Sequence, residues 1–415
     1  MNILFLNTRD GNGGAAIAAY RLLEGIKNLT GSQIKMLVNN KSTTPYYVEG
    51  PETDFKKLKA LFRNPAEKLA LIPYTQREKV IFSSSIVPNY DLFNKIKNIN
   101  PDILHLHWIN SGFLRLEQLL KIKAPIAWTL HDMWAFTGGC HCAGKCLKYL
   151  EECNNCPVLN SNNYRDLAYR NFKNKEKIFK NLDLTIICPS SWLSENAKKS
   201  KLLKNINTIT IPNGLDINIF KPSEKKVARN ILNLPQDKKL LLFGAFNCLI
   251  DKNKGLNHLI NALTFFKNEE FELVIFGANK PENPLGFDLK THYMGILKDE
   301  ITMALLYSAC DATIAPSIQE SFGQTASESL ACATPVIAFE ATGLLDIVDH
   351  KTSGYLAKPY EAADLAQGIK WALSLSNDEY KIISTNARKK AEENFDIKLV
   401  SQKYYDLYKT LNIHL

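Results

Sequence analysis

Short apolar runs alternate with segments of helical period along nearly the whole chain, and this alternation limits the accessible folds more than any other feature. The runs are rich in β-branched and aromatic side chains. Strands that alternate with helices form βαβ units, whose strands are parallel and whose helices cover both faces of the sheet. The sequence therefore predicts an α/β fold with doubly wound parallel sheets. The expected strands are Asn2–Asn7, Ile34–Asn39, Ile103–His107, Ile126–His131, Leu184–Pro189, Thr208–Ile211, Leu240–Phe243, Leu273–Phe276, Ala312–Ala315 and Val336–Phe339.

Length and a break near the middle of the chain predict two domains. The 415 residues exceed one ordinary core, at about 150 residues per domain. Pro212 and Gly214 end a strand, and the next strand begins only after a polar, lysine-rich stretch. We expect one domain over residues 1–212 and a second over 213–394. Because ligands of open α/β sheets bind beyond the carboxyl ends of the strands, we also expect a cleft between the domains.

Composition excludes several classes of protein. With 45% apolar and 22% charged residues, the chain is neither disordered nor collagen-like. It starts without a cationic segment followed by a long apolar stretch, and it has no window of about 18 uninterrupted apolar residues. We therefore expect a cytoplasmic protein.

A formal net charge of +9 favours an anionic partner, such as a nucleotide diphosphate or the inner face of a membrane. No nucleic-acid-reading signature accompanies the charge, so no nucleic-acid partner is expected. The segment from Phe55 to Arg63 mixes apolar and cationic residues at near-helical spacing. It fits a helix lying on a lipid surface, which would make the protein peripheral at the inner membrane face, and equally an ordinary helix with a solvated lysine face.

A glycine-rich loop follows the first expected strand. Glycines such as Gly13 and Gly14 let backbone N–H groups approach a ligand, and the next helix adds the partial positive charge of its N-terminus. The loop would bind a phosphate or a sugar oxygen of the donor, or it is only a tight turn. Its spacing also fits a dinucleotide fingerprint, but Asn39 stands where the acidic ribose ligand is expected.

The most specific motif places two carboxylates at the start of one helix. Glu320 lies in the loop after strand Ala312–Ala315, and Glu328 lies about a turn inside the helix that opens near Gly323. A carboxylate can accept two hydroxyl hydrogen bonds, so Glu328 suits a ribose diol. Glu320 suits sugar hydroxyls, and Ser321, Phe322 and Gly323 complete the expected donor-binding loop.

This stretch resembles the E-x7-E signature of glycosyltransferase family 4, the retaining transferases of GT-B fold. Residues 212–216 are similar to the inter-domain linker of that family, and residues 333–338 to its next strand. The resemblance covers nearly the whole chain. It implies two Rossmann-like domains, the first for the acceptor and the second for the nucleotide-sugar donor. It also implies that residues 395–415 form a helix that crosses back to the first domain.

Three further residues match positions of this family. Lys254 stands where the family has a lysine that holds the donor phosphates, and it would stabilise the leaving diphosphate. The arginine that many relatives carry is absent, so Lys252 is its expected substitute, with a solvated loop charge as the alternative. His131 ends a strand on the sugar-binding side and would hydrogen-bond to a sugar or acceptor hydroxyl. The resemblance thus assigns catalytic roles to Glu320, Lys254 and His131.

Five cysteines lie close together within residues 138–157, a segment that resembles an insertion in one subgroup linked to bacterial surface-polysaccharide synthesis. Cys153 and Cys156 have the C-x2-C spacing of a zinc half-site, which Cys140 and Cys146 would complete. A structural zinc is our hypothesis. Reduced thiols and a pair of disulfides are the alternatives.

The resemblance implies a retaining glycosyltransferase that uses a UDP- or GDP-sugar, a glycan or lipid-linked saccharide acceptor, and no cofactor for catalysis. Retention without an evident nucleophile implies front-face attack, in which the diphosphate helps to take the acceptor proton. An NAD-dependent oxidoreductase or a nucleotide-sugar epimerase is one alternative, and it leaves Glu320 and Glu328 unexplained. A non-catalytic nucleotide-sugar-binding protein is the other, supported by the missing arginine.

Overall fold

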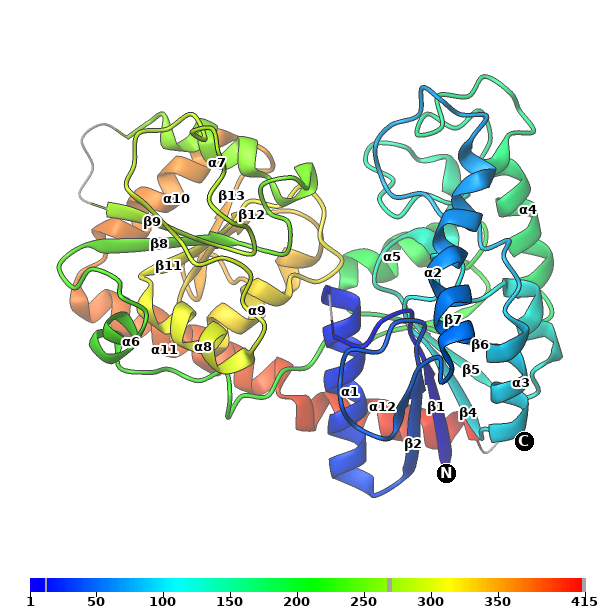
Figure 1. Cartoon of the computed structure of the whole chain (residues 1–415). Coiled ribbons are helices and arrows are strands. Elements are labelled where there is room, and N and C mark those ends of the chain that lie inside the picture. Colours follow the sequence, from blue (N-terminus) through cyan, green and yellow to red (C-terminus); the bar gives the residue numbers. More distant parts are fainter. Residues whose placement is uncertain (12, 267–270, 413–415) are drawn as a thin grey trace. The chain divides into compact units, whose positions relative to one another are not determined.

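The computed structural model describes residues 1–11, 13–266 and 271–412. The chain forms two compact units, one of Met1–Pro212 together with Val400–Leu415 and one of Asn213–Leu399 (Figure 1). Each unit is built on one parallel sheet, so the predicted α/β class is confirmed. No helix in the described part of the chain is both long and apolar enough to cross a membrane.

The first unit contains a seven-stranded sheet of order β3-β2-β1-β4-β5-β6-β7. The chain moves outward from β1 to β3 and returns to β4, so the order reverses between β1 and β4. Loops at such a reversal splay apart and leave room for a ligand. The strands are β1 Asn2–Leu6, β2 Gln33–Leu37, β3 Val48–Glu49, β4 Ile103–Leu106, β5 Ile126–Thr129, β6 Leu184–Cys188 and β7 Asn207–Thr210. The helices are α1 Gly14–Thr30, α2 Asp54–Lys68, α3 Tyr90–Ile99, α4 Leu167–Phe179, α5 Ser191–Lys199 and α12 Ile397–Asn412.

The second unit contains a six-stranded sheet of order β10-β9-β8-β11-β12-β13, which reverses between β8 and β11. The strands are β8 Lys239–Gly244, β9 Phe271–Phe276, β10 Thr291–Tyr293, β11 Ala312–Ala315, β12 Val336–Phe339 and β13 Gly354–Ala357. The helices are α6 Lys225–Ile231, α7 Leu256–Leu263, α8 Glu300–Ala309, α9 Gln324–Ala331, α10 Ala362–Ser374 and α11 Asn377–Phe395. Short 3-10 helices across the chain are η1 Leu69–Leu71, η2 Leu116–Lys121, η3 Trp134–Phe136, η4 Lys148–Leu150, η5 Lys252–Lys254 and η6 Thr342–Asp346.

The C-terminal helix α12 packs on the first sheet. The side chains of Tyr404 and Tyr408 are almost completely buried there. The Tyr408 hydroxyl lies 2.6 Å from Nδ1 of His105, and the Tyr404 hydroxyl lies 2.9 Å from that of Thr129. Burying each aromatic ring is worth about 1.5–3 kcal/mol. Buried rings and satisfied hydroxyls together hold the end of the chain against the first unit.

Candidate active site

In the second unit, Glu320 and Lys254 come from the loops that follow β11 and β8, the strands at which the order reverses. Lys254 Nζ lies 2.7 Å from Glu320 Oε1, and the two side chains are 23% and 20% exposed. Asn253 accepts the amide hydrogen of Ile318 through its carbonyl at 2.8 Å. Its own side chain donates to the carbonyl of Gln319 at 2.5 Å. The two loops are therefore joined beside the ion pair.

Gly255 allows this close approach. Its φ is +75°, and a Cβ at this position would lie 1.8 Å from the carbonyl oxygen of Pro316. No side chain fits there, because the contact is with backbone that cannot rotate away. A glycine directly after Lys254 therefore lets the lysine-bearing turn lie against the loop that leads to Glu320.

The second carboxylate, Glu328, is buried inside α9. Its Oε2 accepts a hydrogen bond from the hydroxyl of Tyr307 at 2.9 Å, and the Tyr307 side chain is fully buried. Gly323 precedes the helix with φ +110°. Tyr307 thus orients Glu328, a positioning contact that the sequence did not reveal because 21 residues separate the two.

Other members of the predicted donor loop have different surroundings. The Phe322 side chain is 3% exposed and packs edge-on against Phe395 at 5.5 Å between ring centroids. Only its backbone is therefore suited to meet a ligand. Ser321 is partly exposed and Lys252 is exposed. The structure pairs Glu320 with Lys254 rather than with Lys252.

In the first unit, His131 follows β5 and is partly buried. Its Nε2 lies 3.0 Å from Nδ1 of His107. Burial lowers the pKa of His131 to about 4, although the charge of Asp132 acts in the opposite direction. The imidazole is therefore neutral near pH 7, as a group that exchanges hydrogen bonds with a sugar hydroxyl should be.

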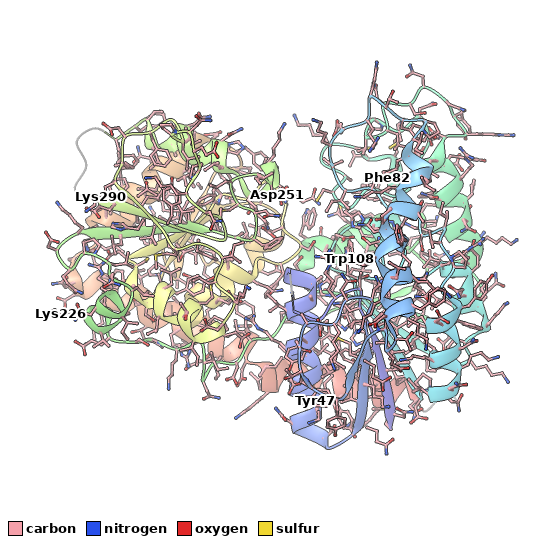
Figure 2. All side chains as sticks on the ribbon, in the orientation of Figure 1. Tyr47, Phe82, Trp108, Lys226, Asp251 and Lys290 are labelled. Atoms are coloured by element: carbon pink, nitrogen blue, oxygen red, sulfur yellow. The ribbon has the colours of Figure 1, made fainter. Side chains whose placement is uncertain are left out.

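Asp132 forms a buried polar network that the sequence analysis missed. Its Oδ2 accepts from Nδ1 of His141 at 2.7 Å and from the indole of Trp108, whose position is labelled in Figure 2, at 2.9 Å. Burial opposes its ionisation, but the charge and hydrogen bond of His141, with the Trp134 amide and the Trp108 indole, outweigh it and lower the pKa. On the far side of the ring, Nε2 of His141 lies 2.9 Å from the hydroxyl of Ser83.

The glycine loop of the first unit ends at α1. Gly13 has φ +94°, and a Cβ there would meet nothing within 4 Å, so the approach to the backbone is open. Gly14 is the first residue of the helix. Asp10, the acidic residue of this loop, accepts hydrogen bonds from the amides and hydroxyls of Ser42 and Thr43. These bonds hold the loop against residues 42–43.

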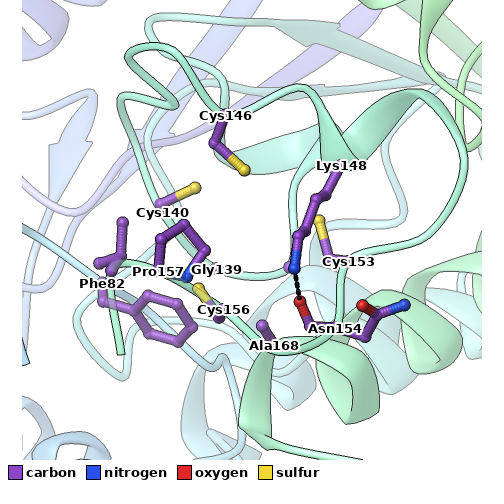
Figure 3. A pocket seen from close by; sticks show the side chains of 12 residues that line it. Phe82, Gly139, Cys140, Cys146, Lys148, Cys153, Asn154, Cys156, Pro157 and Ala168 are labelled. Atoms are coloured by element: carbon purple, nitrogen blue, oxygen red, sulfur yellow. Dashed lines mark hydrogen bonds between the residues drawn. The ribbon is translucent and has the colours of Figure 1, made fainter. Parts of the chain in front are cut away.

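The four cysteines predicted as metal ligands line one pocket in the first unit, which we call the cysteine pocket (Figure 3). Cys140, Cys153 and Cys156 are buried, and all four are free thiols. Burial raises the pKa of the Cys140 thiol to about 12. As they stand, no three histidine, cysteine, aspartate or glutamate side chains of the described residues are arranged to hold a metal ion. The structure thus gathers these cysteines without forming a closed metal centre.

Comparison with solved structures identifies the fold as GT-B. Sucrose-phosphate synthase from Thermosynechococcus elongatus superposes with a TM-score of 0.71 at 19% identity and covers 100% of both chains. Anabaena Alr3699/HepE, solved in complex with UDP-glucose, superposes with a TM-score of 0.67 at 17% identity and covers 99% of this chain and 100% of its own. The predicted GT-B architecture is confirmed.

Sequence comparison gives the family. Residues 12–219 match the family described as Glycosyltransferase Family 4, and residues 224–390 match Glycosyl transferases group 1. An uncharacterized glycosyltransferase of Methanocaldococcus jannaschii is 27% identical over 202 residues, which are 47% of this chain and 50% of the relative. The chain spans about half the length of the relatives that it matches in sequence. The chain belongs to glycosyltransferase family 4.

Proposed function

We propose that this protein is a retaining glycosyltransferase that transfers a sugar from a nucleotide-sugar donor to a glycan or lipid-linked saccharide. The observation that carries the proposal is the Glu320–Lys254 pair at the reversal of strand order in the second sheet. The same chain segment continues into α9, which presents Glu328. One ammonium group and two carboxylates at this place match the phosphates, sugar and ribose of such a donor.

The ion pair suggests how donor binding proceeds. In the structure Glu320 neutralises Lys254. A donor diphosphate would replace Glu320 as the partner of Lys254, because it carries more negative charge than one carboxylate. Glu320 would then be free to accept hydrogen bonds from sugar hydroxyls. Lys254 would go on to stabilise the charge that develops on the leaving diphosphate. In this proposal the transferred sugar keeps its configuration through front-face attack, and a phosphate oxygen helps to take the acceptor proton.

Uridine diphosphate is the donor group that we favour over guanosine diphosphate, because the similarly folded Alr3699/HepE was solved with UDP and with UDP-glucose. The alternative of an NAD-dependent enzyme gains no support, since Asn39 rather than an acidic residue follows β2, where the ribose ligand is expected. In the proposed function Glu320 and Glu328 both contact the donor, whereas the NAD alternative leaves them unexplained.

Helix α2 supports a lipid-linked acceptor and peripheral association with a membrane. Of its residues only Ala60 and Glu67 are buried. Phe55, Leu61 and Phe62 are each more than 60% exposed. Apolar side chains beside lysines on an exposed helix suit the boundary of an anionic lipid layer. This surface would bring the enzyme to an acceptor for surface-polysaccharide synthesis.

Thermal unfolding with a panel of UDP-, GDP- and ADP-sugars tests the donor assignment, because a ligand that binds only the folded state raises the melting temperature. We expect stabilisation by UDP-sugars in the wild type and loss of most of it in Glu328→Gln. Glu393→Gln, an exposed glutamate of α11, is the matched control and should keep the full shift. Stabilisation by NAD but by no nucleotide sugar would overturn the proposal. Release of UDP without transfer to any saccharide would leave only a donor-binding protein.

A further inference from the structure

The cysteine pocket has features that reduced thiols filling a core do not need. The side chains of Cys140, Cys146, Cys153 and Cys156 line the same small space (Figure 3). Cys142 lies in the same loop, but it is exposed and does not line the pocket. The set that converges contains Cys153 and Cys156, which have the C-x2-C spacing of a metal half-site, together with Cys140 and Cys146.

The loop that carries the last two cysteines is held by a lysine. Lys148 Nζ donates to the carbonyls of Asn154 and Asn155 at 2.8 and 2.9 Å, between Cys153 and Cys156 (Figure 3). Contacts of this kind around a metal site fix the direction of its ligands.

A buried cation lies beside the same segment. Lys175 is 2% exposed, and its Nζ donates to the carbonyls of Trp134 and Thr137 while lying 3.6 Å from the centre of the Trp134 ring. Burial lowers the pKa of Lys175 to about 7, and the electrostatic effect of Cys153 and Cys140 acts in the opposite direction. A buried ammonium group is costly unless negative charge stands nearby. A site that carries net negative charge would supply it.

We propose that Cys140, Cys146, Cys153 and Cys156 bind one structural zinc ion. Binding converts four thiols to thiolates, releases four protons and gives a centre of net charge −2, which the Lys175 ammonium partly balances. Zinc–sulfur bonds are about 2.3 Å long, so the ion draws the four sulfurs inward from the positions that they occupy around the pocket. This inference is independent of the donor proposal, because it concerns only residues of the first unit.

The zinc would fix the loop that carries His141, the hydrogen-bond partner of Asp132. Cys140 and Cys142 flank His141 in the sequence. The amide of Ser83 donates a hydrogen bond to the carbonyl of the preceding Gly139 at 2.9 Å. Fixing Cys140 therefore fixes the loop that carries His141 between Asp132 and Ser83. Because the four ligands fill a tetrahedral shell, the ion would have no open position for a substrate.

Metal analysis of the full chain, purified in reducing buffer without chelator, tests the proposal. We expect about one zinc per chain, and replacement by cobalt(II) should give the intense near-ultraviolet absorption of cobalt–thiolate bonds. Cys156→Ser and Cys153→Ser should lose the metal, whereas Cys142→Ser should keep it. If the serine variants do not fold, the wild type still decides, since a strong chelator should lower its melting temperature and expose four additional thiols to titration.

Three results would overturn the inference. One is a wild-type chain without bound metal whose cysteines all react as thiols after unfolding and whose melting temperature does not respond to added zinc. Another is a chain whose measured mass is lower by the hydrogens lost in one or two disulfides. Peptide mapping would then place those disulfides among these four cysteines. Loss of zinc from Cys142→Ser together with Cys156→Ser would also contradict it, because Cys142 lies outside the pocket.

Discussion

The candidate groups of the two units are held by different interactions. In the second unit, Glu320 and Lys254 form a partly exposed ion pair. In the first unit, His131 lies beside His107, and Asp132 and His141 share a largely buried hydrogen bond. A partly exposed charged pair can exchange partners, whereas buried hydrogen bonds hold one arrangement. We therefore expect substitutions to act through charge in the second unit and through the arrangement of hydrogen bonds in the first.

The largest effect that would test this comparison is expected on the donor side. Lys254→Ala should lower kcat by about 10²–10³-fold, because it removes a charge that stabilises the leaving diphosphate. Lys252→Ala, two residues away and exposed, should change kcat less than threefold. Steady-state kinetics with a UDP-sugar decide it. Equal losses in both variants would show that the paired lysine has no special role.

The histidines of the first unit should make the stability of the fold depend on pH. Burial lowers the pKa of His131 to about 4 and lowers those of His105 and His107 in the same direction. An unfolded histidine titrates near 6.5. Between these values the unfolded chain binds more protons, so stability is complete above about pH 6.5 and falls as the pH drops toward 4.

For His131 alone we expect a loss of about 2 kcal/mol over this interval, less than the full shift because the ring is partly exposed. Denaturant unfolding at a series of pH values measures it. His131→Asn should flatten the dependence, while His350→Asn, at an exposed histidine, should leave it unchanged. An equal slope in the His131 variant would contradict the assigned neutral state.

The exposed apolar face of α2 is a further difference between the first unit and the second. Phe62 is 63% exposed, and burying a phenylalanine in lipid is worth about 1.5–3 kcal/mol. Phe62→Ser should weaken binding to vesicles that contain anionic lipid by about tenfold. Ile231→Ser, at an exposed apolar residue of α6 in the second unit, is the control and should bind as the wild type does. No vesicle binding by the wild type would remove the membrane proposal.

The smallest effect concerns the support of Glu328. Tyr307→Phe removes the hydroxyl that donates to Oε2 at 2.9 Å, and it should reduce stability by about 1 kcal/mol. The Kd for the donor should rise several-fold because the carboxylate loses its orientation, with kcat little changed. Tyr355→Phe, which removes a comparable bond to Asp364, should cost stability without changing the donor Kd. Identical binding in both variants would show that Tyr307 has a structural role only.

Much of the fold was predictable because buried parallel strands leave a strong apolar signal. The ten expected strands are all present with small shifts at their ends. The missed strands β3 and β10 are short and lie at the sheet edges, and β13 also lies at an edge. An edge strand pairs on one side only, so its residues need not be uniformly apolar. That is why such strands carry little sequence signal.

The candidate site was predictable only where its residues are close in sequence. Glu320 and Glu328 lie eight positions apart, so the strand, loop and helix start that carry them could be recognised in the sequence. The contact between Ser83 and His141 could not be recognised, because 58 residues separate the two. Tyr307 is on α8, and its hydroxyl became important only through the packing of α8 on α9.

The sequence by itself therefore determined the class of fold, the strand pattern and the chemical groups available for a donor. These depend on apolar periodicity and on motifs that span a few residues, which are local properties. Only the tertiary structure decided that Lys254 faces Glu320, that Asp132 pairs with His141, and that four cysteines share one pocket. Such pairings depend on the order of strands in each sheet and on which turns pack together. Those are set by burial of the whole core rather than by any segment alone.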